Sequence, residues 1–263
     1  MKQKWEILFC ALLIFVGGCT CRPTDPAELA VYEANNDPFE PTNRAIFKVN
    51  QTLDRAVIKP VAKGYRFIVP KWIRSAIYNF TLNLRQPVYF VNALLQGEPG
   101  QAGVISKRFL VNTFMGFWGT IDVAGEMEIP AYDNDFGQTL GVWGVPPGPF
   151  VMLPVLGPSD VRDAVGYGVD TVAAPVNWAT NSIWPGLIYS KTALEGIDTR
   201  ERALDFLDSM EKTSTDYYAT LRTMYQQNRE KKVNDNRATP TDQETGAEEK
   251  AAYEFDFPEF EDE

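Results

Sequence analysis

One long stretch near the middle of the chain carries no charged residue. It runs from Phe136 to Ser159 and is interrupted by five prolines and five glycines. A regular helix over this whole length is excluded, because each proline lacks a backbone donor and clashes with the preceding turn. Irregular backbone cannot face lipid hydrocarbon, since its polar groups would have no partners there. The stretch must therefore pack against helices of the same protein or line a cavity. We expect an irregular loop or a short hairpin, with a strand at Phe150–Leu153.

The N-terminus is typical of an exported lipoprotein. Lys2 and Lys4 precede an apolar core, Ile7 to Val16, that is too short to span a bilayer. Small residues then lead to Cys19, which resembles the cysteine that bacterial lipoproteins carry at their cleavage and lipidation site. An ordinary secretory signal with a chance cysteine is the alternative, but the cysteine lies where the apolar core ends, which favours lipidation. Thr20 follows it, where an aspartate would resemble an inner-membrane retention signal, so the outer membrane is favoured.

The composition divides the chain into four parts. We assign residues 1–18 to the signal peptide, 19–36 to a lipidated tether, 37–232 to a single folded domain and 233–263 to an acidic, disordered tail. Residues 241–263 hold ten acidic side chains against one lysine, so this segment accounts for −9 of the net charge of −10. The folded domain is therefore close to neutral. It lacks the basic face of a nucleic-acid-binding protein, and no nucleic-acid partner is expected.

Helical patterns dominate the folded domain, so the predicted class is mainly α. Apolar residues recur at helical spacing after Pro70, and a segment that is apolar almost all round follows Pro87. We expect Pro87 to begin a new helix and residues 101–114 to form a further one. Thr42 or Asn43 is predicted to cap the first helix of the domain.

The second half of the domain is also predicted to be mainly helical. Ser159 is predicted to cap a helix that runs to about residue 173, and two helices are expected over about residues 191–230, with a joint at Thr199 or at residues 213–215. A second uncharged run, from Thr171 to Ser190, is also broken by prolines and holds Trp178 and Trp184. Tryptophans of this kind favour the level of lipid headgroups. Both uncharged runs together favour a shared cavity at membrane level.

Several motifs resemble one known family. They are Asn36-Asp-Pro-Phe-Glu-Pro-Thr-Asn-Arg44, Leu94-Leu-Gln-Gly97, Phe109 with Asn112-Thr113, Gly119-Thr-Ile-Asp-Val-Ala124, Asp135-Phe-Gly-Gln-Thr-Leu-Gly-Val-Trp-Gly144, Gly148-Pro-Phe150, Leu153-Pro-Val-Leu-Gly-Pro158 with Arg162-Asp163, and Leu194-Glu-Gly-Ile-Asp-Thr-Arg200. On these residues the chain resembles the MlaA/VacJ outer-membrane lipoproteins of the phospholipid asymmetry system. The resemblance covers about residues 36–225.

The resemblance implies a ring-like, mainly helical single domain embedded at the membrane interface, on the periplasmic side of the outer membrane. It implies a path for phospholipid removed from the outer leaflet and transferred to a periplasmic carrier resembling MlaC. It also implies association with a trimeric porin. No cofactor and no metal are expected. The direction of transport is implied by the family alone.

The uncharged stretch supplies the candidate residues for such a path. We expect them to border the path or to form a gating loop, and they are Gly141, Trp143, Gly144, Gly148, Phe150 and Leu153. Glycines in a gate would let the loop move. The alternative is that these glycines only permit close packing against helices, and the sequence does not decide between the two.

Four charged residues in apolar segments have a similar double interpretation. Arg108, Asp122, Arg162 and Asp163 either form buried pairs that fix the fold or meet a lipid headgroup at the mouth of the path. Buried pairing is favoured, because charges in apolar surroundings are usually paired.

Two other classes of function compete with transport. An enzyme such as a lipid or peptidoglycan hydrolase is disfavoured, because the chain contains no histidine and no Gly-x-Ser-x-Gly elbow. A structural lipoprotein that binds a porin and moves no lipid stays open, because both it and a conduit need a membrane face and a protein face.

Overall fold

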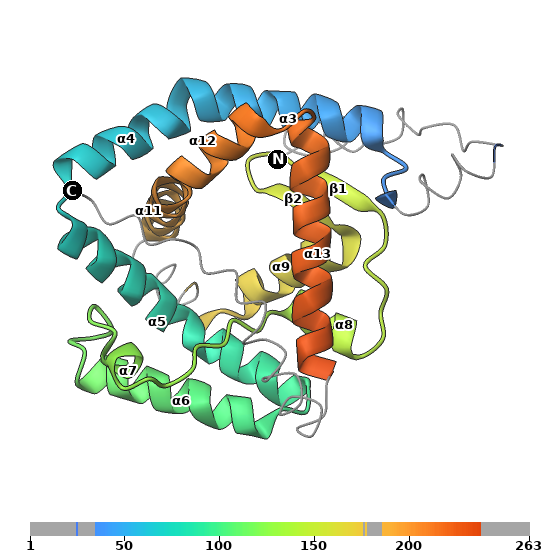
Figure 1. The fold of residues 1–263 in the computed structure, drawn as a ribbon. Helices are drawn as coiled ribbons and strands as arrows, with labels where there is room; N and C mark the ends of the chain where they lie inside the picture. Colours follow the sequence, from blue (N-terminus) through green and yellow to red (C-terminus); the bar gives the residue numbers. More distant parts are fainter. Residues whose placement is uncertain (1–24, 26–34, 176, 178–185, 238–263) are drawn as a thin grey trace.

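The helices follow one another around a ring, as Figure 1 shows. The computed structural model of the chain describes residue 25 and residues 35–175, 177 and 186–237. Cys19, Trp178 and Trp184 lie outside the described residues, as do the signal peptide and most of the predicted tail. The described part confirms the mainly α, ring-like prediction. Among the helices of this described part, none is both long enough and apolar enough to cross a bilayer.

One side of the ring is a nearly continuous helical rod. Helix α3 (Glu40–Leu53) passes through a π-helical turn, η1 (Asp54–Ile58), into α4 (Lys59–Ile68). The wider π turn ends two residues before Pro60, whose ring would clash with the carbonyl four residues earlier in an unbroken α-helix. The predicted cap was wrong: α3 begins before Thr42, with Phe39 at its N-cap. Buried Asn43 instead donates to the carbonyl of Phe150 at 3.0 Å and accepts from the amide of Met152 at 2.9 Å.

The next side is a helical hairpin. Helix α5 (Lys71–Leu95) packs along α6 (Pro99–Phe114), and α7 (Val123–Glu126) follows. Pro70 precedes α5 as predicted, but Pro87 lies inside α5 and does not begin a helix. The helix tolerates the lost hydrogen bond because packing on α6 holds its second half, with Ala93, Ala102 and Ile105 buried between them.

The uncharged stretch forms regular structure at both of its ends. The chain turns through α8 (Phe136–Val142) and an antiparallel hairpin of β1 (Phe150–Leu153) and β2 (Gly157–Asp160), in which Leu153 faces Gly157. The predicted strand is thus confirmed, whereas an irregular loop at 136–142 was wrong, because Asp135 caps a helix there by accepting from the amide of Gln138 at 2.8 Å.

Helix α9 (Val161–Ala173) follows the hairpin directly. Its N-cap is Asp160, which accepts from the amide of Asp163 at 2.8 Å, and not Ser159, which belongs to β2. The carboxylate is the better cap here because it is charged and faces the positive end of the helix.

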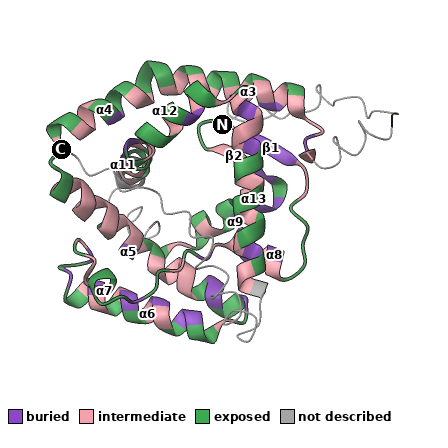
Figure 2. Ribbon diagram, viewed as in Figure 1, coloured by how far each residue is buried: buried purple, intermediate pink, exposed green. Residues whose placement is uncertain are grey.

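Three helices complete the ring. Helix α11 (Gly186–Arg202) packs against α4, and α12 (Leu204–Thr213) and α13 (Tyr217–Arg237) follow. The predicted joint at residues 213–215 separates α12 from α13, but the prediction of two helices was wrong, because a second break at Ala203 divides α11 from α12. Helix α13 continues five residues beyond the predicted domain limit at 232. Buried residues lie where elements meet (Figure 2), for example in the cluster of Phe150, Met152 and Tyr218 between the hairpin and α13.

Candidate functional site

An apolar pocket of about 570 Å³ lies among α5, α6, α9 and the first residue of α8. Most of its wall is hydrocarbon, with Phe90, Val91, Phe109, Leu110, Phe136 and Val169 among the lining side chains. Its volume falls within the range of small-molecule sites in proteins, and its lining matches their usual apolar character. The pocket can hold a flexible hydrocarbon chain.

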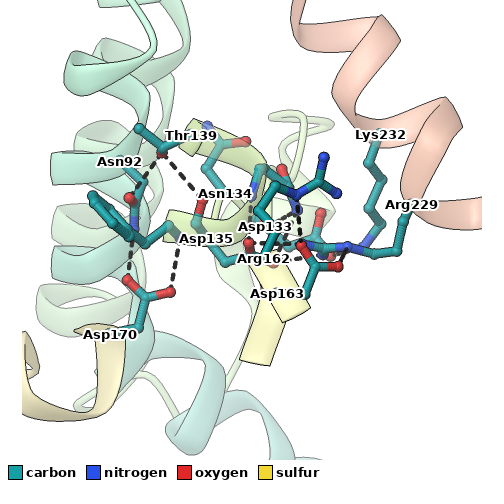
Figure 3. A network of polar contacts seen from close by, with 12 residues as sticks. Asn92, Asp133, Asn134, Asp135, Thr139, Arg162, Asp163, Asp170, Arg229 and Lys232 are labelled. Carbon is teal, nitrogen blue, oxygen red and sulfur yellow. Dashed lines mark hydrogen bonds and ion pairs between the residues drawn. The ribbon is translucent and has the colours of Figure 1, made fainter. Parts of the chain in front are cut away.

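Polar groups are gathered at one part of this pocket. Asp170 on α9 accepts from the side-chain amide of Asn92 on α5 at 3.0 Å and from the backbone amide of Phe136 at 2.8 Å. Thr139 on α8 donates to the side-chain oxygen of Asn92 at 2.9 Å. Figure 3 shows Asp170 and Thr139 on either side of Asn92. Three elements that carry pocket residues are thus tied together by one short hydrogen-bonded chain.

Behind this chain, α13 holds α8 and α9 through arginine. Arg229 donates to both carboxylate oxygens of Asp135, at 2.6 and 2.9 Å, and it also forms an ion pair with Asp163 on α9. Asp163 further accepts from Arg162 at 3.1 Å and from the hydroxyl of Tyr225 at 2.5 Å. Since Asp163 and Arg162 are buried, this network fixes the position of α9 rather than offering charge to a ligand.

The carboxylates of this region have shifted pKa values. Burial raises the pKa of Asp160 to about 6; the hydrogen bond from the backbone amide of Asp163 opposes the rise, the negative charge of Asp163 adds to it, and the charge of Arg162 opposes it. Burial also raises the pKa of Asp170, although the amide of Phe136 and the side chain of Asn92 oppose the rise by donating to it. Burial also acts to raise the pKa of Asp135, but the hydrogen bonds and the positive charge of Arg229 outweigh burial, so the pKa of Asp135 is lowered. Two carboxyl groups with raised pKa values therefore belong to α9, the buried Asp160 at its N-cap and the half-buried Asp170 within the helix.

The residues predicted to form a path lie beside the pocket, not in its wall. Trp143 is exposed, packs edge-on against the ring of Phe136 and donates to the carbonyl of Leu95 at 2.9 Å. Both Phe136 and Leu95 line the pocket, so Trp143 stands behind its wall. Phe150 is a fully buried core residue, and Leu153 is a half-buried residue of β1 paired with Gly157.

The three predicted glycines differ from one another. A Cβ on Gly141 would lie 2.8 Å from Val233 and 2.9 Å from Arg162, so this glycine permits the packing of α8 on α9 and α13. Gly144 has φ +93° and open space around it, and Gly148 has φ +71° with a Cβ position 3.3 Å from Val161. Close packing therefore accounts for Gly141, while Gly144 and Gly148 serve turns of the exposed loop between α8 and β1.

The four predicted charges are all paired. Arg108 donates to both oxygens of Asp122, at 2.8 and 2.9 Å, and the side-chain amide of Asn112 donates to Asp122 at 2.8 Å. Arg162 and Asp163 belong to the network described above. The pair of Arg162 and Asp163 is buried, whereas in the pair of Arg108 and Asp122 the carboxylate is partly exposed.

The residues at the polar part of the pocket were not among those predicted from the sequence. Asn92 is the one polar residue in the otherwise apolar segment from Val88 to Leu95 apart from the hydroxyl of Tyr89, which was a usable signal. The sequence carried no such signal for Asp170 and Arg229, because the contacts that each makes depend on how α9 and α13 are placed around the ring.

Fold and pocket together define a class, a helical ring with an apolar pocket. Residues 35–232 match the model of the MlaA lipoprotein family, and the chain belongs to that family. It is 37% identical over 230 residues to the intermembrane phospholipid transport system lipoprotein MlaA of Escherichia coli K12, covering 86% of each chain. It is 36% identical over 240 residues to the protein of the same name in Haemophilus influenzae, covering 89% of this chain and 92% of that one.

A solved structure has the same fold. It is described by the words "Structural basis for maintenance of bacterial outer membrane lipid asymmetry", and the match has a TM-score of 0.67 at 37% identity. The match covers 75% of this chain and 98% of the solved chain. The predicted family is therefore confirmed by sequence and by fold.

Proposed function

We propose that this chain is an outer-membrane lipoprotein that removes phospholipid from the outer leaflet and passes it to a periplasmic carrier, so maintaining outer-membrane lipid asymmetry. The observation that carries the proposal is the apolar pocket among α5, α6, α9 and Phe136, found in a chain whose relatives are named for intermembrane phospholipid transport. The pocket receives an acyl chain, because each CH₂ withdrawn from water contributes about 0.8 kcal/mol.

The rest of the chain suits this task. Cys19 carries the lipid anchor and holds the domain on the periplasmic side of the outer membrane. A carrier resembling MlaC accepts the phospholipid, and a trimeric porin is the neighbour in the membrane. No nucleophile or general base is needed, and the whole sequence contains no histidine. Among the residues that the structure describes, no group of acidic, cysteine or histidine side chains could hold a metal ion.

The loop between α8 and β1 is the movable border of the path. Trp143 joins this loop to the pocket wall through Phe136 and Leu95. Gly144 and Gly148 allow the loop to change conformation, whereas Gly141 stays in place because α8 has no room there.

A pocket-filling variant tests the proposal. Val169→Trp projects a large ring into the pocket from α9, and Val49→Trp places the same ring at an exposed position of α3 away from the pocket. We expect phospholipid transfer from reconstituted bilayers to the periplasmic carrier to fall severalfold in Val169→Trp and to be unchanged in Val49→Trp. Equal transfer by both variants contradicts the role of the pocket.

A deletion strain separates transport from a purely structural role. The proposal predicts phospholipid at the cell surface of the deletion strain, cleared by the restored gene but not by Val169→Trp. A porin-binding lipoprotein that moves nothing would leave no lipid phenotype, or one that Val169→Trp rescues fully.

A further inference from the structure

The wall of the apolar pocket contains one charged side chain, and this side chain is an acid. Asp170 lines the pocket from α9, and the described wall includes no lysine or arginine. The other polar residues of the wall are neutral; they are Gln86, Asn92 and Ser106. Burying an ionised group costs free energy unless the group is paired, so a pocket that held only hydrocarbon would not need a carboxylate.

Only neutral donors hold the carboxylate of Asp170. One oxygen accepts from the side-chain amide of Asn92 at 3.0 Å, and the other accepts from the backbone amide of Phe136 at 2.8 Å. Within the described part of the chain Asp170 forms no ion pair, whereas Asp135 and Asp163 both pair with Arg229. Burial raises the pKa of Asp170 in spite of its two hydrogen bonds. The carboxylate therefore lacks a positive partner, and each oxygen keeps a lone pair with which to bind one.

Gln86 adds a second acceptor to the same pocket. Its side-chain oxygen is buried and accepts no hydrogen bond within the described structure. Asn92 has no donor left for a ligand, because its side-chain amide already donates to the carbonyl of Val88 at 3.1 Å and to Asp170. The pocket thus offers a negative charge and an unused acceptor inside a wall of hydrocarbon.

We propose that Asp170 selects phospholipids whose headgroup carries a primary ammonium group, as that of phosphatidylethanolamine does. The inference rests on the proposed function, because the lipid must first enter this pocket. The ammonium group supplies both a positive charge and N–H donors, and hydrogen bonds between charged groups are shorter and stronger than neutral ones. The hydrocarbon of the remaining wall commits the ligand to a lipid and excludes a small free amine.

Two other common headgroups lack one of these properties. A choline headgroup has the positive charge but no N–H group, so it cannot donate to Asp170 or to the oxygen of Gln86. A glycerol headgroup has hydroxyl donors but no positive charge, which leaves the lipid with the net negative charge of its phosphate. Both lipids should therefore bind less well than phosphatidylethanolamine in a pocket whose one charged residue is an acid.

The test compares three lipids that differ only in headgroup. Phosphatidylethanolamine, phosphatidylcholine and phosphatidylglycerol, each with the same photoreactive acyl chain, are added separately at a low fraction to vesicles of unlabelled phosphatidylcholine that hold the full-length protein. We expect adducts on the pocket-lining segments, relative to adducts elsewhere on the protein, to be about tenfold more abundant for the ethanolamine lipid. Equal yields from all three lipids would overturn the selectivity and leave transport intact, whereas no pocket adducts from any lipid would overturn both proposals.

The choline lipid has a separate diagnostic outcome. The rings of Phe90, Phe109 and Phe136 line the pocket and can attract a quaternary ammonium group through their faces. Pocket adducts from the choline lipid that match those from the ethanolamine lipid would mean that the rings bind the positive charge without N–H donors. This result would overturn the role of Asp170.

A first pair of variants assigns the selectivity to one carboxylate. Asp170→Asn removes the charge from the pocket, and Glu126→Gln removes an equal charge from an exposed position at the end of α7. The preference for the ethanolamine lipid should fall from about tenfold to less than about twofold in Asp170→Asn and stay unchanged in Glu126→Gln. A full preference in Asp170→Asn would overturn the proposal.

A second pair covers the case in which Asp170→Asn does not fold, since that variant exchanges one acceptor oxygen for a donor. Gln86→Lys places an ammonium group in the pocket, and the oxygen that it replaces has no hydrogen bond to lose. Gln227→Lys adds the same charge at an exposed position of α13. Gln86→Lys should lose the preference for the ethanolamine lipid, and Gln227→Lys should keep it, with folding of both checked by urea unfolding. An undiminished preference in folded Gln86→Lys would overturn the proposal.

Discussion

Gly137 of α8 and Gly166 of α9 lie in direct backbone contact. A Cβ on Gly166 would stand 2.3 Å from the backbone nitrogen of Gly137 and 2.6 Å from its Cα. The crossing brings Asp135, at the start of α8, within reach of Arg229, and it brings Phe136 to Asp170 at the pocket. Because neither glycine has a side chain, α8 and α9 approach closely, and this contact sets the position of the pocket wall.

This contact predicts that substitutions of two glycines in α9 have unequal effects on stability. Gly166→Ala should lower the free energy of unfolding by about 1–3 kcal/mol, because backbone cannot move aside as a side chain can. Gly168 has nothing within 4 Å of its Cβ position, so Gly168→Ala should be neutral or stabilise the helix by about 0.5–1 kcal/mol. Urea unfolding of both variants checks this, and equal effects would contradict the contact.

Removing Arg229 should leave the buried carboxylate of Asp163 and the half-buried carboxylate of Asp135 without their main cation. We expect Arg229→Gln to destabilise the protein by about 3–5 kcal/mol, the usual effect of breaking a buried ion pair on one side. Lys232, one turn further along α13, pairs with Asp133 near the surface. Lys232→Gln is the matched control and should change stability by less than about 1 kcal/mol. Comparable losses would mean that the network is not a buried one.

The raised pKa of Asp160 makes stability depend on pH. Because the folded chain binds this proton up to about pH 6 and the unfolded chain releases it near 3.8, stability falls as the pH rises through that window. Asp160→Asn keeps a side chain that can cap the helix but has no carboxyl group to titrate. The free energy of unfolding of this variant, relative to that of the unmodified protein, should therefore rise by about 1–3 kcal/mol between pH 4 and pH 6. Reading the difference between the two proteins cancels the opposite contributions of Asp122 and Asp135, whose pKa values are lowered. Parallel pH profiles would contradict the prediction.

Arg108 and Asp122 should be energetically coupled. A double-mutant cycle of Arg108→Leu and Asp122→Asn is expected to give a coupling free energy of about 1–3 kcal/mol, because both carboxylate oxygens receive a guanidinium hydrogen bond. The cycle is measured by urea unfolding. Additive effects would show that the pair does not hold the turn that follows α6.

Much of the fold could be predicted from local chemistry. Pro70 at a helix start, the helix over residues 101–114 and the strand Phe150–Leu153 follow from the backbone restrictions of proline and from apolar spacing. The prediction that Pro87 begins a helix was wrong, because packing on α6 outweighs the loss of the hydrogen bond that proline removes. Helix α8 was missed, although Asp135 before an uncharged segment is an N-cap signal.

The candidate site was less accessible to sequence reasoning. Apolar periodicity identifies the faces of α5, α6 and α9, but not the gap left where those faces meet. Trp143 was found because a tryptophan in an uncharged, glycine-rich segment stands out, yet the sequence does not show that it contacts Leu95, which is 48 residues away, or Phe136 at the other end of α8. Gly141 shows the limit most clearly, since the positions of Val233 and Arg162 decide that it serves packing.

The most direct measurement is cross-linking of a phospholipid that carries a photoreactive group on one acyl chain. The full-length protein is irradiated in vesicles of this lipid, and adducts are located by mass spectrometry. The account predicts adducts on the pocket-lining segments of α5, α6 and α9, centred on Val91, Phe109 and Val169, and their loss in Val169→Trp but not in Val49→Trp. Adducts that avoid these segments, or that persist unchanged in Val169→Trp, would contradict it.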